Sequence, residues 1–265
     1  MKKRITALLL LLTLSVTSLF ACTSADKSES ASDKTAKTSK STSTKKQELT
    51  PVTLNEVAHS IFYAPMYVAI EKGYFANEGI DLSLVTGFGA DKTMTAVLSG
   101  TADIGFMGSE ASIYTYNEGA NDYVVNFAQL TQRAGNFLVA REDIKDFKWE
   151  DLKGKKVIGG RKGGMPEMVF EYILNQNHID PATDLTIDQN IDFGSTAAAF
   201  AEDKSDYDFT VEFEPGATNL EKQGKGYVVA SLGTDSGYVP YTAFSAKKSY
   251  INKHPEVVQG FTNAL

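Results

Sequence analysis

Apolar strand-like runs alternate with helix-like segments from residue 51 onward. Residues 52–58, 81–86 and 102–107 have the short apolar pattern of strands, and apolar residues at helical spacing follow each of them. The intervening loops are HSIFYAP, GFGAD and MGSE. Because strand and helix alternation builds largely parallel sheets with right-handed crossovers, we predict the α/β class.

A second series of the same kind begins after Arg133. Its predicted strands are residues 137–140, 185–187, 207–213 and 227–231, and WEDLKGKKVIGG adds a turn and a buried strand. Two sheets in one chain indicate two lobes, and ligands of open parallel sheets bind beyond the carboxyl ends of the strands, where the loops fall. We expect hinge closure about the two crossover segments, residues 132–136 and 246–250. The predicted lobes are residues 51–133 plus 249–265 and residues 134–248, each a mixed, mostly parallel sheet flanked by helices.

Residues 1–22 are predicted to be a lipoprotein signal peptide. The start MKKR is basic, residues 5–20 are apolar, and the lone cysteine, Cys22, ends the sequence LFAC, which resembles the bacterial lipobox. The alternative is an ordinary signal peptide or short span followed by an irrelevant cysteine, although the apolar run is shorter than the ~20 residues of a spanning helix. Residues 23–50 are rich in Ser, Thr and Lys, which predicts a disordered tether.

Net charge and the motifs in the sequence argue against several classes of function. The formal net charge is −7, and the first 50 residues are basic, so the folded part is acidic. An acidic folded part argues against nucleic acid as a partner. His59, His178 and His254 share no metal-ligand spacing, and neither G-x-S-x-G nor H-E-x-x-H occurs. We therefore expect no metal, no cofactor and no enzymatic activity.

The loop GGRKGGMPE, which ends at Glu167, places four glycines around an Arg-Lys pair before a helix. With Pro166 at the first helical position, the amides of Glu167 and Met168 would lack helical partners. Gly163 and Gly164 would let the backbone approach a ligand closely. We therefore predict a ligand cradle; the alternative is that the Glu167 carboxylate itself satisfies the helix end.

Aromatic and polar residues near the other loops are further candidates. Phe62 and Tyr63 would stack on a planar ligand or pack in the core. Ser109 and Glu110 would contact ligand or simply cap a helix. Arg133, at the crossover, would pair with a ligand anion or be solvated at a hinge.

Charged residues of the second series leave the ligand's charge open. Arg161 would attract an anion or remain solvated on its loop. Glu212 and Glu214 would suit an amino-bearing ring or lie at an exposed strand end, and Tyr238 and Tyr241 would line the cleft or the lobe junction.

The order of several runs resembles that of a known family. YAPMYVAIEKGYFANEGIDLSLV, SGTADIGFMGSEAS and EFEPGATNLEKQGKGYVVASLG are similar to segments of the extracellular substrate-binding proteins of ABC importers for nitrate, sulfonates, taurine and thiamine-precursor pyrimidines. The resemblance implies a periplasmic-binding-protein-like type II fold whose two lobes close on one small molecule and deliver it to a permease. The lipobox and the tether fit this function, and we expect a monomer that is lipid-anchored at the extracellular face of the cytoplasmic membrane of a Gram-positive bacterium. The alternatives are a pyrimidine-precursor biosynthetic enzyme on this fold and an adhesin-like surface lipoprotein.

Family members usually continue beyond the point that matches FTNAL, so we expect the first lobe to be truncated. The expected ligand is a small anion or an amino-bearing heteroaromatic ring. The predicted ligand-binding residues are Phe62, Tyr63, Gly108, Ser109, Glu110, Gln132, Arg133, Arg161, Gly163, Gly164, Met165, Glu214 and Tyr241, with Cys22 as the lipidation site.

Overall fold

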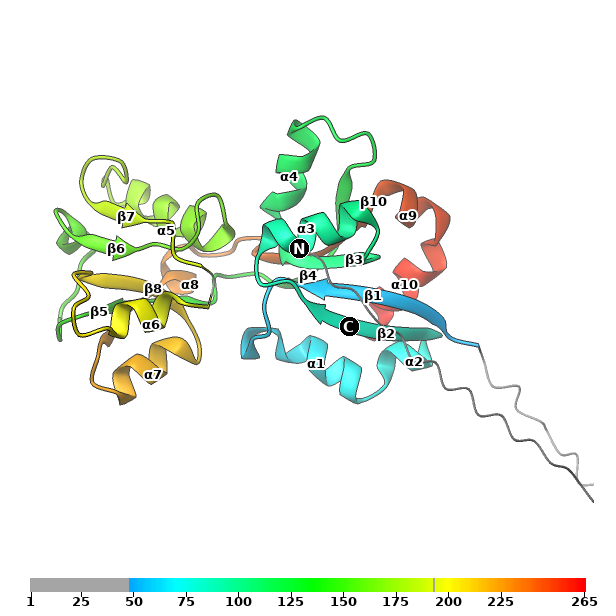
Figure 1. The fold of residues 1–265 in the computed structure, drawn as a ribbon, viewed down its shortest axis with the longest axis horizontal. Coiled ribbons are helices and arrows are strands. Elements are labelled where there is room, and N and C mark those ends of the chain that lie inside the picture. The colour runs from blue at the N-terminus through cyan, green and yellow to red at the C-terminus, as the bar shows by residue number, and fades with distance from the viewer. Residues whose placement is uncertain (1–47, 193) are drawn as a thin grey trace, which may run out of the picture. The chain divides into compact units, whose positions relative to one another are not determined.

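The computed structural model describes residues 48–192 and 194–265. The predicted signal peptide, Cys22 and the tether up to residue 47 lie outside the described residues. Residues 46–265 form one compact unit with two five-stranded sheets, each flanked by helices (Figure 1). The predicted α/β class is confirmed.

The first sheet has the strand order β2-β1-β3-β10-β4. Its parallel ladders join β1 to β2 and β3, whereas β10 runs antiparallel between β3 and β4. The strands are β1 (Thr50–Glu56), β2 (Ile80–Thr86), β3 (Ile104–Gly108), β4 (Val124–Thr131) and β10 (Thr242–Lys247). The helices are η1 (Ile61–Tyr63), α1 (Ala64–Glu71), α2 (Tyr74–Asn77), α3 (Ala90–Ser99), α4 (Glu110–Asn117), α9 (Lys248–Lys253) and α10 (Pro255–Ala264). We call this sheet and its helices the first lobe.

Helices cover both faces of the first sheet. On one face, α1, α2 and α10 bury an aromatic core in which the rings of Phe106 and Phe244 stack with centroids 4.3 Å apart. On the other face, Met94 and Val97 of α3 pack against Met107 of β3. Because both faces are covered, the central strand β3 is a continuous apolar run, whereas buried and exposed residues alternate along β2 at the edge of the sheet.

The second sheet has the strand order β7-β6-β8-β5-β9. β6 pairs in parallel with β7 and β8, and β5 pairs antiparallel with β8 and β9. The strands are β5 (Asn136–Ala140), β6 (Lys156–Ile158), β7 (Thr186–Asp188), β8 (Phe209–Phe213) and β9 (Tyr227–Ser231). The helices are η2 (Trp149–Leu152), α5 (Met165–Gln176), α6 (Thr196–Ala201), α7 (Gly216–Lys222) and α8 (Leu232–Asp235). These elements form the second lobe.

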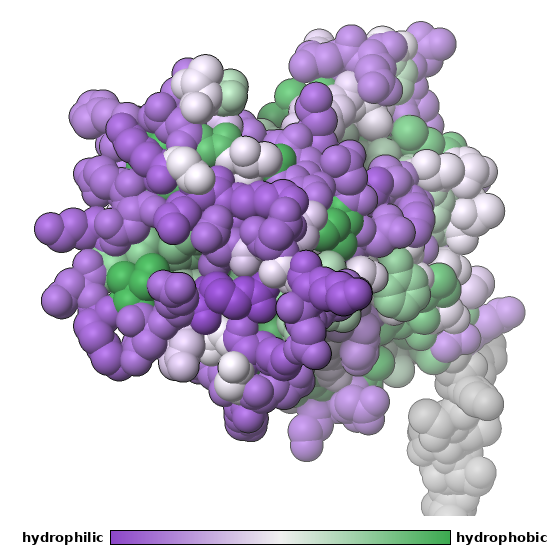
Figure 2. Space-filling view, turned by 60° about the vertical axis from the view of Figure 1, so that its left-hand side comes forward, coloured by the Kyte–Doolittle hydropathy of each residue, from purple (hydrophilic) through white to green (hydrophobic). Residues whose placement is uncertain are grey.

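The second lobe also has a core on each face of its sheet. Phe170 and Ile173 of α5 are buried against Leu138 on one face, and Phe200 and Leu220 of α6 and α7 are buried on the other. Hydrophilic residues cover most of the outer face that Figure 2 shows.

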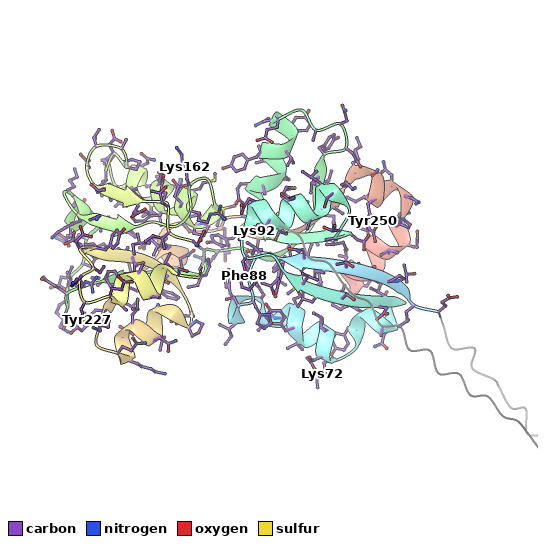
Figure 3. The ribbon with its side chains drawn as sticks, viewed as in Figure 1. Lys72, Phe88, Lys92, Lys162, Tyr227 and Tyr250 are labelled. Carbon is purple, nitrogen blue, oxygen red and sulfur yellow. The ribbon has the colours of Figure 1, made fainter. Side chains whose placement is uncertain are left out.

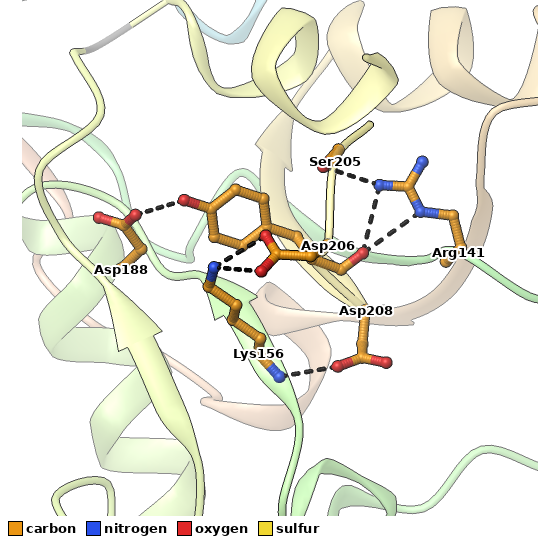
Figure 4. Close-up of polar contacts among 7 residues, drawn as sticks. Arg141, Lys156, Asp188, Ser205, Asp206 and Asp208 are labelled. Carbon is orange, nitrogen blue, oxygen red and sulfur yellow. Dashed lines mark hydrogen bonds and ion pairs between the residues drawn. The ribbon is translucent and has the colours of Figure 1, made fainter. Parts of the chain in front are cut away.

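A polar network fixes the segment that leads into β8 (Figure 4). The guanidinium of Arg141 donates to the carbonyl oxygen of Phe200 at 2.7 Å and to the hydroxyl of Ser205 at 3.0 Å. The ammonium of Lys156 lies 2.8 Å from both carboxylate oxygens of Asp206. These bonds hold the chain so that β8 enters the sheet beside β6, with Lys156 N donating to Asp208 at 2.8 Å.

The chain crosses between the lobes twice, and the second crossing differs from our prediction. The first is residues 132–135, between β4 and β5, as expected. The return is residues 236–241, because residues 242–247 form β10 inside the first sheet and residues 248–253 form α9. The crossover predicted at residues 246–250 was therefore wrong, and residues 242–248 of the predicted second lobe belong to the first. The reason is that β10 is flanked by strands on both sides and buried on both faces, so it lacks the alternation that marks an amphipathic strand.

Within residues 48–192 and 194–265, no helix combines the length and the apolar character needed to cross a lipid bilayer. In the same residues, no group of three or more His, Cys, Asp or Glu side chains is arranged to hold a metal ion.

Candidate functional site

A cleft of about 630 Å³ lies between the two lobes, lined by residues of both. Its walls come from the carboxyl ends of β1, β3, β6 and β8 and from the first turns of α3, α4 and α5. All four loops that the sequence singled out contribute: HSIFYAP, GFGAD, MGSE and GGRKGGMPE. The cleft therefore lies where open parallel sheets bind ligands.

Most of the predicted ligand-binding residues line this cleft, although their contact with a ligand stays a prediction. Those in the cleft are Tyr63, Gly108, Glu110, Arg161, Gly163, Gly164, Met165, Glu214 and Tyr241. Those outside its lining are Phe62, Ser109, Gln132 and Arg133.

Phe62 packs at the junction of the lobes. Its ring lies 5.9 Å from that of Tyr241 and 6.1 Å from that of Phe213, and it contacts the cores of both lobes. A Cβ on Gly135 would lie 2.7 Å from the Phe62 ring, so the first crossing passes directly over it. These contacts favour the core-packing alternative for Phe62.

Gln132, Arg133 and Ser109 stabilise the crossings. Gln132 O accepts from Val239 N at 3.0 Å, which joins the two crossing segments. Arg133 donates to Gly233 O at 2.7 Å, and its guanidinium lies 4.3 Å from the centre of the Tyr238 ring. The Ser109 hydroxyl donates to a carbonyl of the return crossing, Pro240 O. The geometry favours a hinge role for Arg133 over a ligand contact.

The loop GGRKGGMPE uses several of its amides within the protein. Gly163 and Gly160 have φ of 73° and 91°, which requires glycine. Gly163 N donates to the Glu167 carboxylate at 3.2 Å, as the capping alternative predicted. The helix begins at Met165, so Pro166 is its second residue, and Met168 N already donates to Gly164 O at 3.0 Å. The prediction of a free amide at Met168 was therefore wrong, because the helix starts one residue earlier than Pro166.

Polar contacts between α3, α4 and the loop before α5 join the lobes across the cleft. Met165 N, at the start of α5, donates to Glu110 Oε1 of α4 at 3.0 Å. The Tyr114 hydroxyl of α4 donates to Gly163 O at 3.0 Å. Arg161 forms an ion pair with Asp91 at the start of α3, with N–O distances of 2.8 and 3.2 Å.

The ion pair changes the interpretation of Arg161. Its guanidinium already has a carboxylate partner from the opposite lobe, and the two side chains are 38% and 57% exposed. Although partial burial alone would raise the pKa of Asp91, the hydrogen bond and charge of Arg161 lower it. Figure 3 shows Lys162 on the second lobe, and Phe88 and Lys92 on the side of the first lobe that faces it. The ion pair favours a role for Arg161 in joining the lobes over a role in binding a ligand anion.

Carboxyl groups dominate the polar lining of the cleft. Glu110 is 4% exposed and Glu212 is 5% exposed, and burial raises the pKa of each to about 7. The Thr210 hydroxyl donates to Glu212 at 2.8 Å. Glu214 lines the same wall and accepts from the backbone and the hydroxyl of Thr218. Such a wall disfavours anions and favours groups that donate hydrogen bonds.

Several polar residues of the lining were not predicted from the sequence, among them Asp91, Tyr114, Asn136 and Thr242. Asp91 ends the loop GFGAD and Tyr114 is an exposed position of a predicted helix, and their contacts with Arg161 and Gly163 form only because the other lobe approaches. Asn136 directly precedes an apolar run, which was the available signal for a strand end at the hinge. Thr242 belongs to β10, the strand that was not predicted.

A family model described as "NMT1/THI5 like" matches residues 61–265. The chain belongs to this family. The NMT1/THI5-like match begins in HSIFYAP and includes the whole second sheet, every strand of the first sheet except β1, and every cleft loop after that point. A relative from Bacillus subtilis (strain 168), named "Putative binding protein YtlA", is 54% identical over 222 residues. That match covers 83% of this chain and 66% of the relative, so the chain spans just under two thirds of that protein.

Solved structures share the fold of this NMT1/THI5-like chain. The periplasmic aliphatic sulphonate binding protein SsuA from Escherichia coli matches with a TM-score of 0.62 and 20% identity, covering 81% of this chain and 72% of that one. The periplasmic nitrate-binding protein NrtA from Synechocystis PCC 6803 matches with a TM-score of 0.63 and 18% identity, covering 81% and 60%. At these identities the likeness establishes the two-lobed periplasmic binding protein fold.

Proposed function

We propose that the protein is an extracellular solute-binding protein of an ABC importer. The observation that carries this proposal is one cleft lined by both lobes, with two crossing segments beside it on which the lobes can hinge. Family membership supports it, as does the fold shared with proteins named for sulphonate and nitrate binding. The partners that follow from this function are one small molecule and a permease.

The lining favours an amino-bearing, flat heteroaromatic ligand of the thiamine-precursor pyrimidine type over a sulfonate or nitrate. Glu110, Glu212 and Glu214 line the cleft, whereas the guanidinium of Arg161 is already paired with Asp91. Carboxyl oxygens accept hydrogen bonds from amino groups and repel anions. The aromatic rings of Tyr63 and Tyr241 supply an apolar wall for a planar ring.

Ligand capture proceeds by closure of the lobes. A ligand shifts the equilibrium toward the closed form only through contacts that differ between the open and closed forms, which here means contacts with both lobes at once. The contacts of Glu110 with Met165, of Tyr114 with Gly163 and of Asp91 with Arg161 hold the closed arrangement. A micromolar ligand requires ~8 kcal/mol in total, which a stacked ring and a few charge-assisted hydrogen bonds can supply.

Lipidation of Cys22 is part of the same proposal. Signal removal before Cys22 would leave a diacylated N-terminus, and two acyl chains hold a protein to a membrane far better than one. The predicted tether, which ends before β1 begins at Thr50, would let the lobes reach a permease in the same membrane. This arrangement places a monomer on the extracellular face of the cytoplasmic membrane of a Gram-positive bacterium.

We propose binding without conversion of the ligand. His59 lines the cleft, but its Nδ1 lies 2.9 Å from Glu56, and its ring packs against that of Tyr67, tilted by 32° with centroids 4.5 Å apart. These contacts account for a structural histidine. Export with a lipid anchor also disfavours a biosynthetic enzyme. Turnover of a pyrimidine precursor by the purified protein would overturn this part of the proposal.

Thermal-shift screening tests the function. The compounds are taurine, alkanesulfonates, nitrate, riboflavin and aminopyrimidines, each at rising concentration with residues 51–265 and with the full chain. A ligand at 100 times its dissociation constant stabilises the protein by ~2.7 kcal/mol, which at this size raises the Tm by roughly 5–10 °C. We expect the aminopyrimidines to give this shift, and no shift with any compound of either class would refute the proposed function.

A further inference from the structure

Glu110 lines the cleft and has one buried carboxylate oxygen without a hydrogen-bond partner among the described residues. It is the first residue of α4, and its side chain lies over Gly108, where an added Cβ would be 2.1 Å from Oε2. Oε1 accepts from Met165 N of the opposite lobe. Oε2 is buried and has no hydrogen-bond partner in the described residues. Burial without a partner costs a carboxylate oxygen free energy, so this oxygen calls for a partner from outside the chain.

Among the described residues, Asn136 provides an unpaired donor to complement the unpaired acceptor of Glu110. It is the first residue of β5, directly after the first crossing, and is 1% exposed. Its Oδ1 accepts from the Tyr241 hydroxyl, which fixes the orientation of the amide. Its Nδ2 is buried and, like Glu110 Oε2, lacks a hydrogen-bond partner among the described residues. These two are the only buried side-chain atoms without a partner in the part of the chain that the structure describes, and both residues line the same cleft.

The two positions belong to one corner of the cleft. Burial raises the pKa of Tyr63 to about 12 and that of Tyr241 well above its ordinary value, and the nearby charge of Glu110 contributes to both. The Tyr241 hydroxyl donates to Asn136 Oδ1. The next residue, Thr242, is paired with Gly108 in the ladder between β10 and β3, and the Glu110 carboxylate lies over Gly108, so the two atoms without partners lie on either side of the same end of β10.

We propose that Glu110 Oε2 and Asn136 Nδ2 are the acceptor and the donor that select the ligand. The ligand then carries a hydrogen-bond donor and an acceptor on the same edge, as a primary carboxamide does, or an amino group beside a ring nitrogen. This inference rests on the proposed function and adds to it the residues that set specificity. A compound with the acceptor alone leaves Glu110 Oε2 unpaired, and an anion places like charge against it.

The same carboxylate joins ligand recognition to closure. With a ligand N–H on Oε2 and Met165 N–H on Oε1, Glu110 contacts the ligand and the second lobe simultaneously. A ligand that pairs with Oε2 stabilises the closed form through this one side chain, because the Met165 contact exists only when the lobes meet. Ligands lacking the donor gain no such contact.

Calorimetry with compounds of equal size tests the proposal. The probes are nicotinamide, which has both groups, 3-acetylpyridine, which has the acceptor alone, and nicotinate, which is an anion; 4-aminopyrimidine and 4-methylpyrimidine form a second pair. The measurements are made at pH 8, above the pKa of about 7 that burial gives Glu110. Wild type is expected to bind nicotinamide and 4-aminopyrimidine at least tenfold more tightly than their partners without the donor.

Two variants assign the preference to its residues. Glu110→Gln keeps an oxygen for Met165 N but replaces the other oxygen with a donor, so the tenfold preference is expected to fall to about one. Asn136→Asp keeps the oxygen that binds Tyr241 and removes the donor, so nicotinamide and 3-acetylpyridine are both expected to weaken about tenfold. Tyr114→Phe is the control, because it removes a contact between the lobes and lowers the affinity of all probes by one common factor.

Several results would overturn the proposal. They are equal binding of nicotinamide and 3-acetylpyridine by wild type, tightest binding of nicotinate, an unchanged preference in folded Glu110→Gln, or no binding of any probe. The wild-type preference needs no variant, so a variant that fails to fold does not remove the test. If a sulfonate closes the lobes while this preference is absent, the specificity proposal fails and the solute-binding function stands. If no compound of either class raises the Tm, both fail.

Discussion

Replacing Glu212 with Gln is expected to stabilise the protein at pH 8. Burial raises the pKa of Glu212 from its ordinary 4.5 to about 7, so the folded state pays for ionising a side chain that is 5% exposed. Since one pKa unit corresponds to 1.36 kcal/mol, the ionised group costs the folded state up to ~3 kcal/mol at pH 8. Glutamine has no charge to bury and retains an oxygen that can accept from the Thr210 hydroxyl.

The stabilisation depends on pH with a defined sign. Between pH 4.5 and about 7 the folded wild type binds a proton that the unfolded chain has released, so its stability falls as the pH rises through this window. Below this pH window Glu212 is protonated in both the folded and the unfolded state, so replacing it with glutamine no longer stabilises the folded protein. Glu110 and Glu167 have raised pKa values for the same reason, burial, so only the difference between variant and wild type isolates Glu212.

Urea unfolding of both proteins at pH 5 and pH 8 provides the measurement. The variant is expected to exceed wild type by ~2–3 kcal/mol at pH 8 and by less than ~1 kcal/mol at pH 5, corresponding to a Tm gap of roughly 4–10 °C at the higher pH. The matched control is Glu214→Gln on the same wall, whose carboxylate accepts from Thr218 and which should show a smaller gap. A gap for Glu212→Gln that is absent at pH 8, or equal at both pH values, would refute the reasoning.

Three further predictions concern the lobes and the anchor. Arg161→Ala and Asp91→Asn should each weaken the binding of every ligand by the same ~1.5–5-fold in calorimetry, because each removes one partly exposed ion pair. The double variant should weaken binding no further. A loss of affinity confined to anions would show that Arg161 binds the ligand itself. Gly135→Ala should lower the free energy of unfolding in urea by ~1–3 kcal/mol, because its Cβ would lie 2.7 Å from the Phe62 ring. The double variant Gly135→Ala with Phe62→Leu should recover part of that loss. Unchanged stability of the single variant would contradict the packing. Cys22→Ser should release the protein from cell membranes into the medium in fractionation, and retention on the membrane would exclude the lipid anchor.

The strand and helix alternation was predictable because it depends on local periodicity. In the segment that forms α5, the apolar residues Val169, Phe170, Ile173 and Leu174 have the spacing of one buried helical face, and all four side chains are buried. The glycine loops could be placed at one end of each sheet because parallel strands bring their carboxyl ends together. The loop positions of the cleft therefore followed from sequence.

The missed strand β10 shows the limit of that reasoning. Thr242–Lys247 lies between β3 and β4, with five of its six residues buried. Its short apolar pattern is compatible with a loop, a helix or a strand, and only the pairing partners, far away in the sequence, decide. The second crossing was misplaced for the same reason.

Contacts between the lobes were beyond reach from sequence. Glu110 and Met165 meet across 55 positions, and Asp91 and Arg161 across 70. Neither pair has a local pattern, because each depends on the angle at which two separately folded lobes meet. The lack of a hydrogen-bond partner for Asn136 Nδ2 among the described residues could not be predicted either, because it depends on which groups pack around the side chain in the folded protein.

The position of β10 has a consequence for the order in which the molecule can assemble. Every strand of the second sheet, from β5 to β9, lies in one uninterrupted stretch of chain, whereas β3 and β4 remain separated until β10 is available. During synthesis from the N-terminus the distal half can thus complete its sheet while the earlier half still waits for its central antiparallel strand. A circular permutation that joins the chain ends and opens the chain within a crossing segment would make the sequence of each lobe continuous. The permuted protein should refold faster, because β10 would no longer have to pair with strands far away in the sequence.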